Sequence, residues 1–197
     1  IRQLREDGEW RTLAAALLVL GSGRRIGAVG ARRDGHQLDT VPLCERDFDI
    51  GEDGRLNVTW RGDTSKGGGY GRGDELQVCT NAVEVAYRWL RRFHPNPLGP
   101  DYPLIWDPDD PQLGVAYDHL RSTFDEAWER AMGEMRPKGL LWHSFVYTTV
   151  TTIADELGVQ AAAECTGRST EVVTKKYKRR RHNRSVQIAE RLNEVRG

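Results

Sequence analysis

The chain has 197 residues, of which 38% are hydrophobic and 29% are charged, and its formal net charge is zero. This composition is typical of an ordinary globular protein with one sizeable domain or two small ones. The longest apolar run, residues 13–20, is far too short to span a bilayer, and no signal peptide opens the chain. Its three widely spaced cysteines argue against a disulfide framework and a zinc site. We therefore expect a protein of a reducing compartment with no membrane partner.

The charge is distributed unevenly along this neutral chain. Acidic residues are frequent in residues 101–134, whereas residues 175–184 are almost purely basic and surround Tyr177. Such an asymmetry is typical of a phosphate-binding face, although a solvated basic tail would explain the charge equally well.

The N-terminal half predicts helices followed by a hairpin. The Leu/Ala run within residues 9–31 predicts a buried helix that breaks at residues 21–23, with a second helix beginning near Arg24. Residues 32–54 are polar and rich in Asp and Gly, which predicts a long irregular connection. The alternating segments 55–60 and 76–79 predict two strands joined by a glycine-rich loop.

Helical patterns dominate the remainder. Thr80 is expected to cap a helix, which a proline-rich linker over residues 94–103 follows. Apolar spacing predicts one helix from Asp118 and another that stops at Gly158. We also expect a short helix over 158–167, one capped by Ser169 or Thr170 that carries Tyr177, and an amphipathic tail helix over 184–197. The predicted class is mainly α with a small antiparallel β-sheet (α+β).

Two nucleotide-binding motifs and a metal site were weighed on the same residues. The segment from Gly21 to Gly27 follows an apolar run, but a dinucleotide loop needs glycine at its sixth position, where Ile26 stands. The chain also lacks the alternation of strands and helices that a parallel sheet requires. The glycine-rich loop has no Gly-Lys-Ser/Thr ending, so it is not a P-loop. The five histidines lack metal-ligand spacing.

Four segments, taken in order, resemble the catalytic domain of the tyrosine recombinases, the phage integrase family. "SGRRIGAV" is similar to the turn that carries the first catalytic arginine, at Arg25, and "TSKGGG" resembles the hairpin lysine, at Lys66. "LLWHSFVYTTVTTIADELGV" is similar to the helix that begins with the catalytic histidine, at His143. "CTGRSTEVVTKKY" places Arg168 before the nucleophile, Tyr177. The resemblance covers nearly the whole chain.

Three positions depart from the family pattern. The family's second arginine should follow His143 by three residues, but Val146 stands there. Arg168 replaces a histidine or tryptophan, and Ala28 replaces an acidic residue. A lost arginine removes a donor to the reacting phosphate, which typically costs about 10²- to 10³-fold in rate.

The resemblance implies a metal-independent DNA strand transferase with no cofactor, a site-specific recombinase or integrase that acts through a 3′-phosphotyrosyl intermediate. Its alternative is a catalytically decayed DNA-binding relative on the same fold, because of Val146. The predicted catalytic residues are Tyr177, Arg25, Lys66, His143 and Arg168. The predicted DNA-binding residues are Arg24, Lys175, Lys176, Lys178, Arg179, Arg180 and Arg181.

The resemblance also implies partners and context. Double-stranded DNA is the expected partner, with a monomer in its absence and a homotetramer upon it. We expect residues 1–197 to form a single catalytic domain, without the family's N-terminal DNA-clamp domain, in the cytoplasm at a prokaryotic nucleoid. The sequence leaves open the target site and the choice among integration, excision and resolution.

Overall fold

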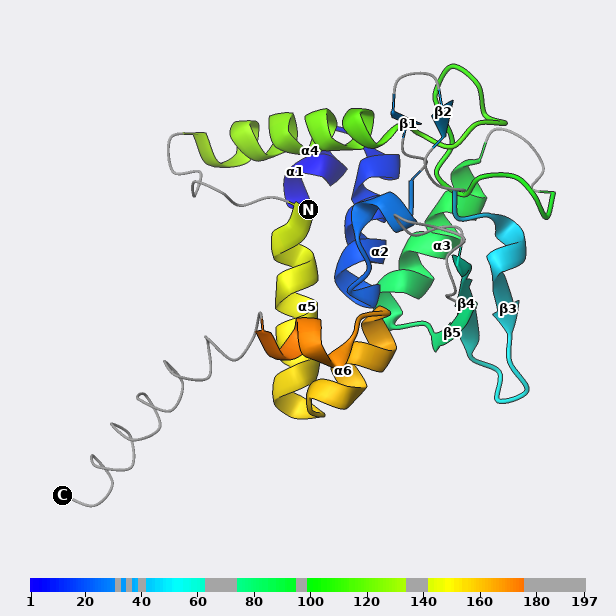
Figure 1. Cartoon of the computed structure of the whole chain (residues 1–197). Helices are drawn as coiled ribbons and strands as arrows, with labels where there is room; N and C mark the ends of the chain where they lie inside the picture. The colour runs from blue at the N-terminus through cyan, green and yellow to red at the C-terminus, as the bar shows by residue number, and fades with distance from the viewer. Residues whose placement is uncertain are drawn as a thin grey trace. The chain divides into compact units, whose positions relative to one another are not determined.

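The computed structural model describes residues 1–30, 33–34, 37–38, 42–62, 74–94, 99–133 and 142–175. The chain divides into two compact units, residues 1–149 (the first unit) and 150–197 (the second unit). Helices predominate and a small antiparallel sheet accompanies them, which confirms the predicted mainly α class (Figure 1). The assignment of residues 1–197 to a single catalytic domain stays a prediction.

The described elements follow one another along the chain with mostly short connections. The helices are α1 (Arg2–Glu6), α2 (Trp10–Ser22), α3 (Asn81–Phe93), α4 (Tyr117–Met132), α5 (Trp142–Glu156) and α6 (Val159–Thr166), with 3-10 turns η1 (Ile26–Ala28) and η2 (Glu45–Asp47). The strands are β1 (Arg33–Asp34), β2 (Gln37–Leu38), β3 (Phe48–Ile50), β4 (Leu56–Trp60) and β5 (Glu75–Val78). Among the described residues, no helix is both long enough and apolar enough to cross a membrane.

Helix α2 is buried on nearly all sides, as its Leu/Ala run predicts for a central helix. It continues through Gly21 and Ser22, so the predicted break at residues 21–23 comes later than expected. Gly23 ends it in the left-handed conformation, with φ of 68°, and donates its N–H to Val19 O at 2.9 Å. The predicted second helix near Arg24 is wrong, because Arg25 is extended and only the 3-10 turn η1 follows.

Helices α2 and α3 lie side by side (Figure 1). A Cβ on Gly21 would lie 2.6 Å from Thr80 Oγ1 and 2.8 Å from Val83 Cγ2, which is closer than real Cβ contacts. Glycine at this position is therefore needed for the close approach of the two helices, and no left-handed backbone is involved.

The three-stranded sheet is antiparallel in the order β3-β4-β5. Phe48 pairs with Val58, and on the same face the Phe48 ring stacks on Tyr87 of α3 at a centroid distance of 4.5 Å. The predicted β4–β5 hairpin is confirmed by its register, in which Trp60 pairs with Glu75. Strand β3 lies where the sequence predicted an irregular connection, because three residues are too few to show a period of two.

An aromatic cluster joins α4 to the start of α5 within the first unit. The Phe124 ring lies 4.5 Å from that of Trp142, 5.5 Å from Phe145 and 5.7 Å from Trp128, measured between centroids. Phe124 is only 2% exposed. The predicted apolar spacing from Asp118 therefore marks the face of α4 that builds this part of the core.

The second unit contains the end of α5, helix α6 and a helical stretch over residues 170–175. Gly158 precedes α6 with φ of 94°, and Gly167 ends it with φ of 60°. Ser169 Oγ accepts the N–H of Val172 at 3.3 Å, which confirms the predicted cap of the next helix. Val173 is fully buried and attaches that helix to the unit.

We expect Phe124→Ala to lower the free energy of unfolding by about 3–5 kcal/mol, because it empties the centre of the aromatic cluster. Chemical denaturation followed by circular dichroism measures the change. Leu76→Thr is the control, since Leu76 is 68% exposed on a strand, and it should change stability by less than about 0.5 kcal/mol. Equal losses in the two variants would contradict this assignment of the core.

Candidate functional site

The C-terminal end of α2 is a junction of three elements. The last carbonyls of a helix lack partners within that helix. Here Leu20 O accepts the hydroxyl of Thr149 from α5 at 2.5 Å, and Gly21 O accepts the hydroxyl of Thr80 at the start of α3 at 3.2 Å. The Thr149 hydroxyl also lies 3.2 Å from Phe145 O. The segment immediately before Arg25 is therefore attached to both α3 and α5.

Arg24 and Arg25 are adjacent in sequence but have different surroundings. Arg25 is exposed and extended, with φ of −73° and ψ of 151°, and its side chain forms no ion pair with a described residue. The Arg24 side chain is 11% exposed, and its Nη2 lies 2.5 Å from Glu75 Oε2. The Arg24 guanidinium also lies 5.3 Å from the centroid of the Trp60 ring. The exposed guanidinium is therefore that of Arg25, the predicted first catalytic arginine.

Lys66 lies outside the described residues, but both ends of its loop are described. Gly62 donates its N–H to Asp74 Oδ1 across the base of the hairpin at 3.1 Å. Arg61, next to β4, contacts Asp47 with Nε 2.8 Å and Nη2 3.1 Å from its carboxylate oxygens. Burial raises the pKa of Asp47, while the hydrogen bond from the Cys44 N–H and the charge of Arg61 oppose that rise. The loop is thus anchored at its base.

His143 is the second residue of α5 and is exposed. The centroid of its ring lies 5.9 Å from that of Tyr147, one helical turn later. The same helix is held to the end of α2 through Thr149. Predicted residues Arg25 and His143 are thus carried by elements that meet at one helix end, although no described hydrogen bond or ion pair joins them.

Val146 stands where the resemblance expects a second arginine, and it faces the interior. Its side chain is 2% exposed, and it belongs to an apolar stripe at four-residue spacing, which consists of Trp142, Val146, Val150 and Ala154. Ala28, the other departure in the first unit, is also buried, at 8% exposure. Both substitutions therefore put small apolar groups into packed positions.

In the second unit, Arg168 follows the left-handed Gly167 and is partly buried. Its Nη1 donates to Thr166 O at 3.0 Å, and its backbone N–H donates to Ala163 O at 3.0 Å. These bonds fix the turn between α6 and the helix that leads toward Tyr177. Lys175 is exposed, and its Nζ lies 2.6 Å from Glu171 Oε1 one turn earlier.

The remaining predicted residues lie outside the described residues. They are Lys66, Lys176, Tyr177, Lys178, Arg179, Arg180 and Arg181, together with the predicted tail helix over 184–197. In the part of the chain that is described, no group of three or more His, Cys, Asp or Glu side chains could hold a metal ion.

Sequence analysis missed the residues that hold the junction together. Thr80 was expected to cap α3, but its hydroxyl makes no cap hydrogen bond and reaches Gly21 O instead. Thr149 lies within the run "YTTVTT", and Glu75 was placed in a loop. No local pattern distinguishes these residues, because each partner is at least 50 positions away in the sequence.

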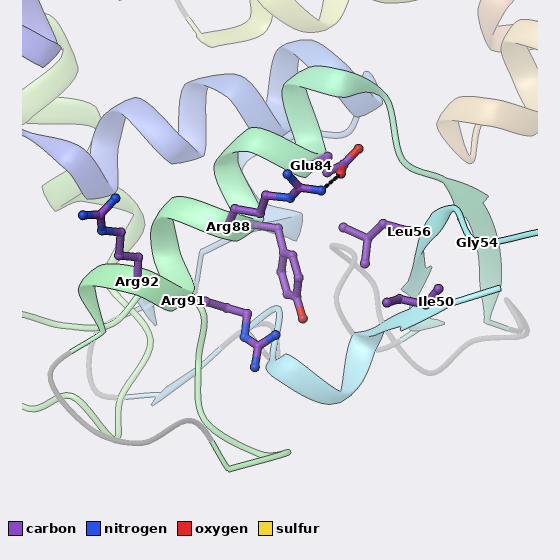
Figure 2. Close-up of a pocket in the computed structure, with 8 residues that line it drawn as sticks. Ile50, Gly54, Leu56, Glu84, Arg88, Arg91 and Arg92 are labelled. Carbon is purple, nitrogen blue, oxygen red and sulfur yellow. Dashed lines mark hydrogen bonds and ion pairs between the residues drawn. The ribbon is translucent and has the colours of Figure 1, made fainter.

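A separate hollow of about 540 Å³ lies between α3 and the turn joining β3 to β4 (Figure 2). Ile50 and Leu56 form its apolar side, and arginines of α3 surround the rest. Arg88 is paired with Glu84, and Arg91 lies 3.2 Å from Glu45. The hydroxyl of Tyr87 donates to the same Glu45 at 2.9 Å. None of the predicted site residues is among its described lining residues.

Solved structures with a similar fold are complexes with DNA. The Tn1549 transposon integrase in complex with circular intermediate DNA matches with a TM-score of 0.56 and 16% identity, over 85% of this chain and 53% of that one. The XerH site-specific recombinase bound to difH in a pre-cleavage complex matches with a TM-score of 0.58 and 14% identity, over 88% and 43%. XerH in a post-cleavage complex gives 0.56 and 14%, over 94% and 46%.

This chain therefore spans about half the length of the structures that it resembles. No protein-family model matches its sequence, and no curated protein matches it either. At such low identity the likeness establishes the arrangement of the backbone, while each residue must be judged on its own surroundings.

We expect Val146→Arg to destabilise the protein by about 3–5 kcal/mol, because it places a charge without a partner in the buried stripe of α5. Thermal and denaturant unfolding measure the change. Thr148→Arg is the matched control, because Thr148 is exposed on the same helix and should tolerate the charge within about 0.5 kcal/mol. A stable Val146→Arg protein would mean that the helix readily turns this position toward solvent.

Proposed function

We propose that this chain, which has the fold of tyrosine recombinase catalytic domains, cleaves and rejoins DNA as part of a site-specific recombinase or integrase. The observation that carries the proposal is the exposed Arg25 at the end of α2, where the helix of His143 is also attached. The base of the Lys66 hairpin is held to the same turn through Arg24 and Glu75. Three predicted catalytic positions are thereby linked through one helix end, in a fold shared with DNA-bound recombinases.

The reaction proposed is a transesterification. The oxygen of Tyr177 attacks the scissile phosphorus and loses its proton, while the bond from phosphorus to the 5′ oxygen breaks. The departing 5′ oxygen takes a proton from Lys66, and a 3′-phosphotyrosyl ester forms. Because one ester replaces another, rejoining reverses the same steps and needs no ATP.

Guanidinium groups suit this chemistry because negative charge accumulates on the non-bridging oxygens of the transition state. A planar guanidinium donates two hydrogen bonds to neighbouring oxygens. Arg25 supplies one such group from the first unit, and His143 assists by holding the phosphate or sharing proton transfer. Val146 offers no donor. In this proposal Arg168 takes over the role of the missing second arginine.

The basic run from Lys175 to Arg181 is proposed to hold backbone phosphates around the cleavage site. The positive charges there also favour the ionised phenol of Tyr177, whose ordinary pKa is about 10. Phosphate contacts position a protein on DNA and leave sequence reading to contacts with the base edges. On DNA, four copies are proposed to assemble on paired sites, and the chain without DNA is proposed to be a monomer in the cytoplasm.

A second candidate function is that of a DNA-binding relative without strand transfer. The buried Val146 favours it, because the position that should donate to the phosphate has become part of the core. The loss of one donor typically lowers a rate by about 10²- to 10³-fold, so a chain with no replacement would retain little activity. A measurement of the covalent intermediate separates the two functions.

We expect the protein to form a covalent adduct with nicked duplex DNA whose short 5′ fragment diffuses away after cleavage. The duplexes are first enriched from a randomised library by rounds of binding, since the target sequence is unknown. Adduct is measured as a shifted band on a denaturing gel. Tyr177→Phe should abolish it because the attacking oxygen is removed, whereas Tyr117→Phe, the control at the start of α4, should leave the yield unchanged.

Arg25→Ala and Arg168→Ala should each lower the rate of adduct formation by about 10²- to 10³-fold, because each removes a donor to the phosphate. If the unaltered protein binds DNA but forms no adduct, the DNA-binding alternative is correct. If Arg168→Ala is as fast as the unaltered protein, Arg168 does not replace the second arginine.

Binding to duplex DNA should weaken steeply with salt. If six phosphates are neutralised, the affinity falls by about 10³-fold between 50 and 200 mM salt, because each contact releases condensed counterions. Fluorescence anisotropy on a labelled duplex measures the slope. Replacing Arg179, Arg180 and Arg181 with glutamine should flatten it by roughly three contacts, and an unchanged slope would exclude the basic run from the interface.

A further inference from the structure

Arg24 contacts a single rung of the hairpin that carries Lys66. Trp60 and Glu75 are cross-strand partners, and they form the last pair of β4 and β5 before the loop. The guanidinium of Arg24 lies 2.5 Å from the Glu75 carboxylate and 5.3 Å from the Trp60 ring centroid. One side chain therefore binds both members of this rung, and it comes from the residue next to Arg25.

The rung itself is held firmly. Trp60 donates its Nε1–H to Gln77 Oε1 at 2.7 Å. Beyond the rung, Gly62 donates to Asp74 at 3.1 Å, and Arg61 is paired with the buried Asp47. The position of the rung is therefore set by the sheet, and a contact to it restrains whatever lies at the other end.

At that other end, the turn of Arg25 has few restraints of its own. Gly23 has a left-handed backbone, and Arg25 is extended before the 3-10 turn. The Arg24 N–H donates to Ser22 Oγ at 3.1 Å, which holds the backbone of the turn. The ion pair of Arg24 then connects this turn to the hairpin, and Thr80 connects the preceding residue, Gly21, to α3.

The chemistry of the contact favours arginine specifically. A guanidinium can stack on an indole ring and still donate to a carboxylate from its edge, whereas the compact ammonium of lysine cannot do both equally well. Because the pair is largely withdrawn from water, its charge-assisted hydrogen bond is stronger than a surface ion pair. A phosphate could recruit Arg24 only by displacing Glu75.

We propose that Arg24 is a positioning residue, which fixes the catalytic Arg25 relative to the loop of Lys66 through the Trp60–Glu75 rung. This role replaces the DNA contact that the sequence predicted for Arg24. The catalytic meaning of this inference rests on the proposed function, whereas the mechanical link between the turn and the hairpin does not.

The test compares Arg24→Met, Glu75→Gln and the double variant with the unaltered protein. Arg11→Met is the matched control, because Arg11 also lies over an indole ring, 5.8 Å from the centroid of Trp106. The rate of adduct formation is measured at saturating nicked DNA, and affinity and its salt dependence are measured on an intact duplex. Hydrogen exchange of residues 75–79 is followed without DNA.

Arg24→Met and Glu75→Gln should each slow adduct formation by about 10- to 100-fold, as a displacement of about 1 Å does. The double variant should be no slower than the slower single variant, because both substitutions break the same link. Arg24→Lys should recover part of the rate. DNA affinity and the salt slope should stay within twofold of the unaltered protein, and Arg11→Met should change nothing.

Three outcomes would overturn the inference. A salt slope reduced by about one contact in Arg24→Met would make Arg24 a phosphate ligand. Multiplying losses in the double variant would show that Arg24 does not act through Glu75. If the unaltered protein forms no adduct, the proposed function fails, and exchange alone decides: faster exchange of residues 75–79 in Arg24→Met than in Arg11→Met supports the link, and equal exchange refutes it.

Discussion

The arrangement of the first unit depends on how the C-terminal end of α2 satisfies its last carbonyl groups. A helix end that is packed among other elements needs donors from them, because it has none of its own. Threonine hydroxyls from α3 and α5 provide these donors at Gly21 and Leu20. One backbone requirement thus determines where two further helices attach. The turn that follows, which carries Arg24 and Arg25, inherits its surroundings from this junction.

The two arginines of that turn illustrate how adjacent charged residues take different roles. Arg24 points into the protein, where Glu75 and Trp60 compensate for the loss of water around its charge. Arg25 follows on an extended backbone and remains exposed. Because the first side chain is fixed, the second is presented in a defined direction. A catalytic site of the proposed kind gains from such preorganisation, since its donors need not move during the reaction.

Val146 raises the opposite issue. A helix that carried an arginine three residues after His143 would have to open a polar path to it, but α5 fills that position with a buried valine within an apolar stripe. The stripe stabilises the helix through burial and leaves His143 exposed one turn earlier. The consequence of this exchange for the proposed chemistry depends on Arg168, whose guanidinium is bonded to its own turn in the second unit.

The sequence by itself determined the class of fold, the positions of α2, α3, α4 and α5, and the β4–β5 hairpin, because apolar spacing is a local signal repeated over many residues. It also singled out Arg25 and His143. It missed β3 and misread the turn after Gly23, where only a few residues decide the conformation. The separate roles of Arg24 and Arg25, the burial of Val146 and the threonine contacts at the end of α2 were decided by the tertiary structure alone. Their physical reason is the same in each case, since a side chain's role depends on partners that chain folding brings from distant positions.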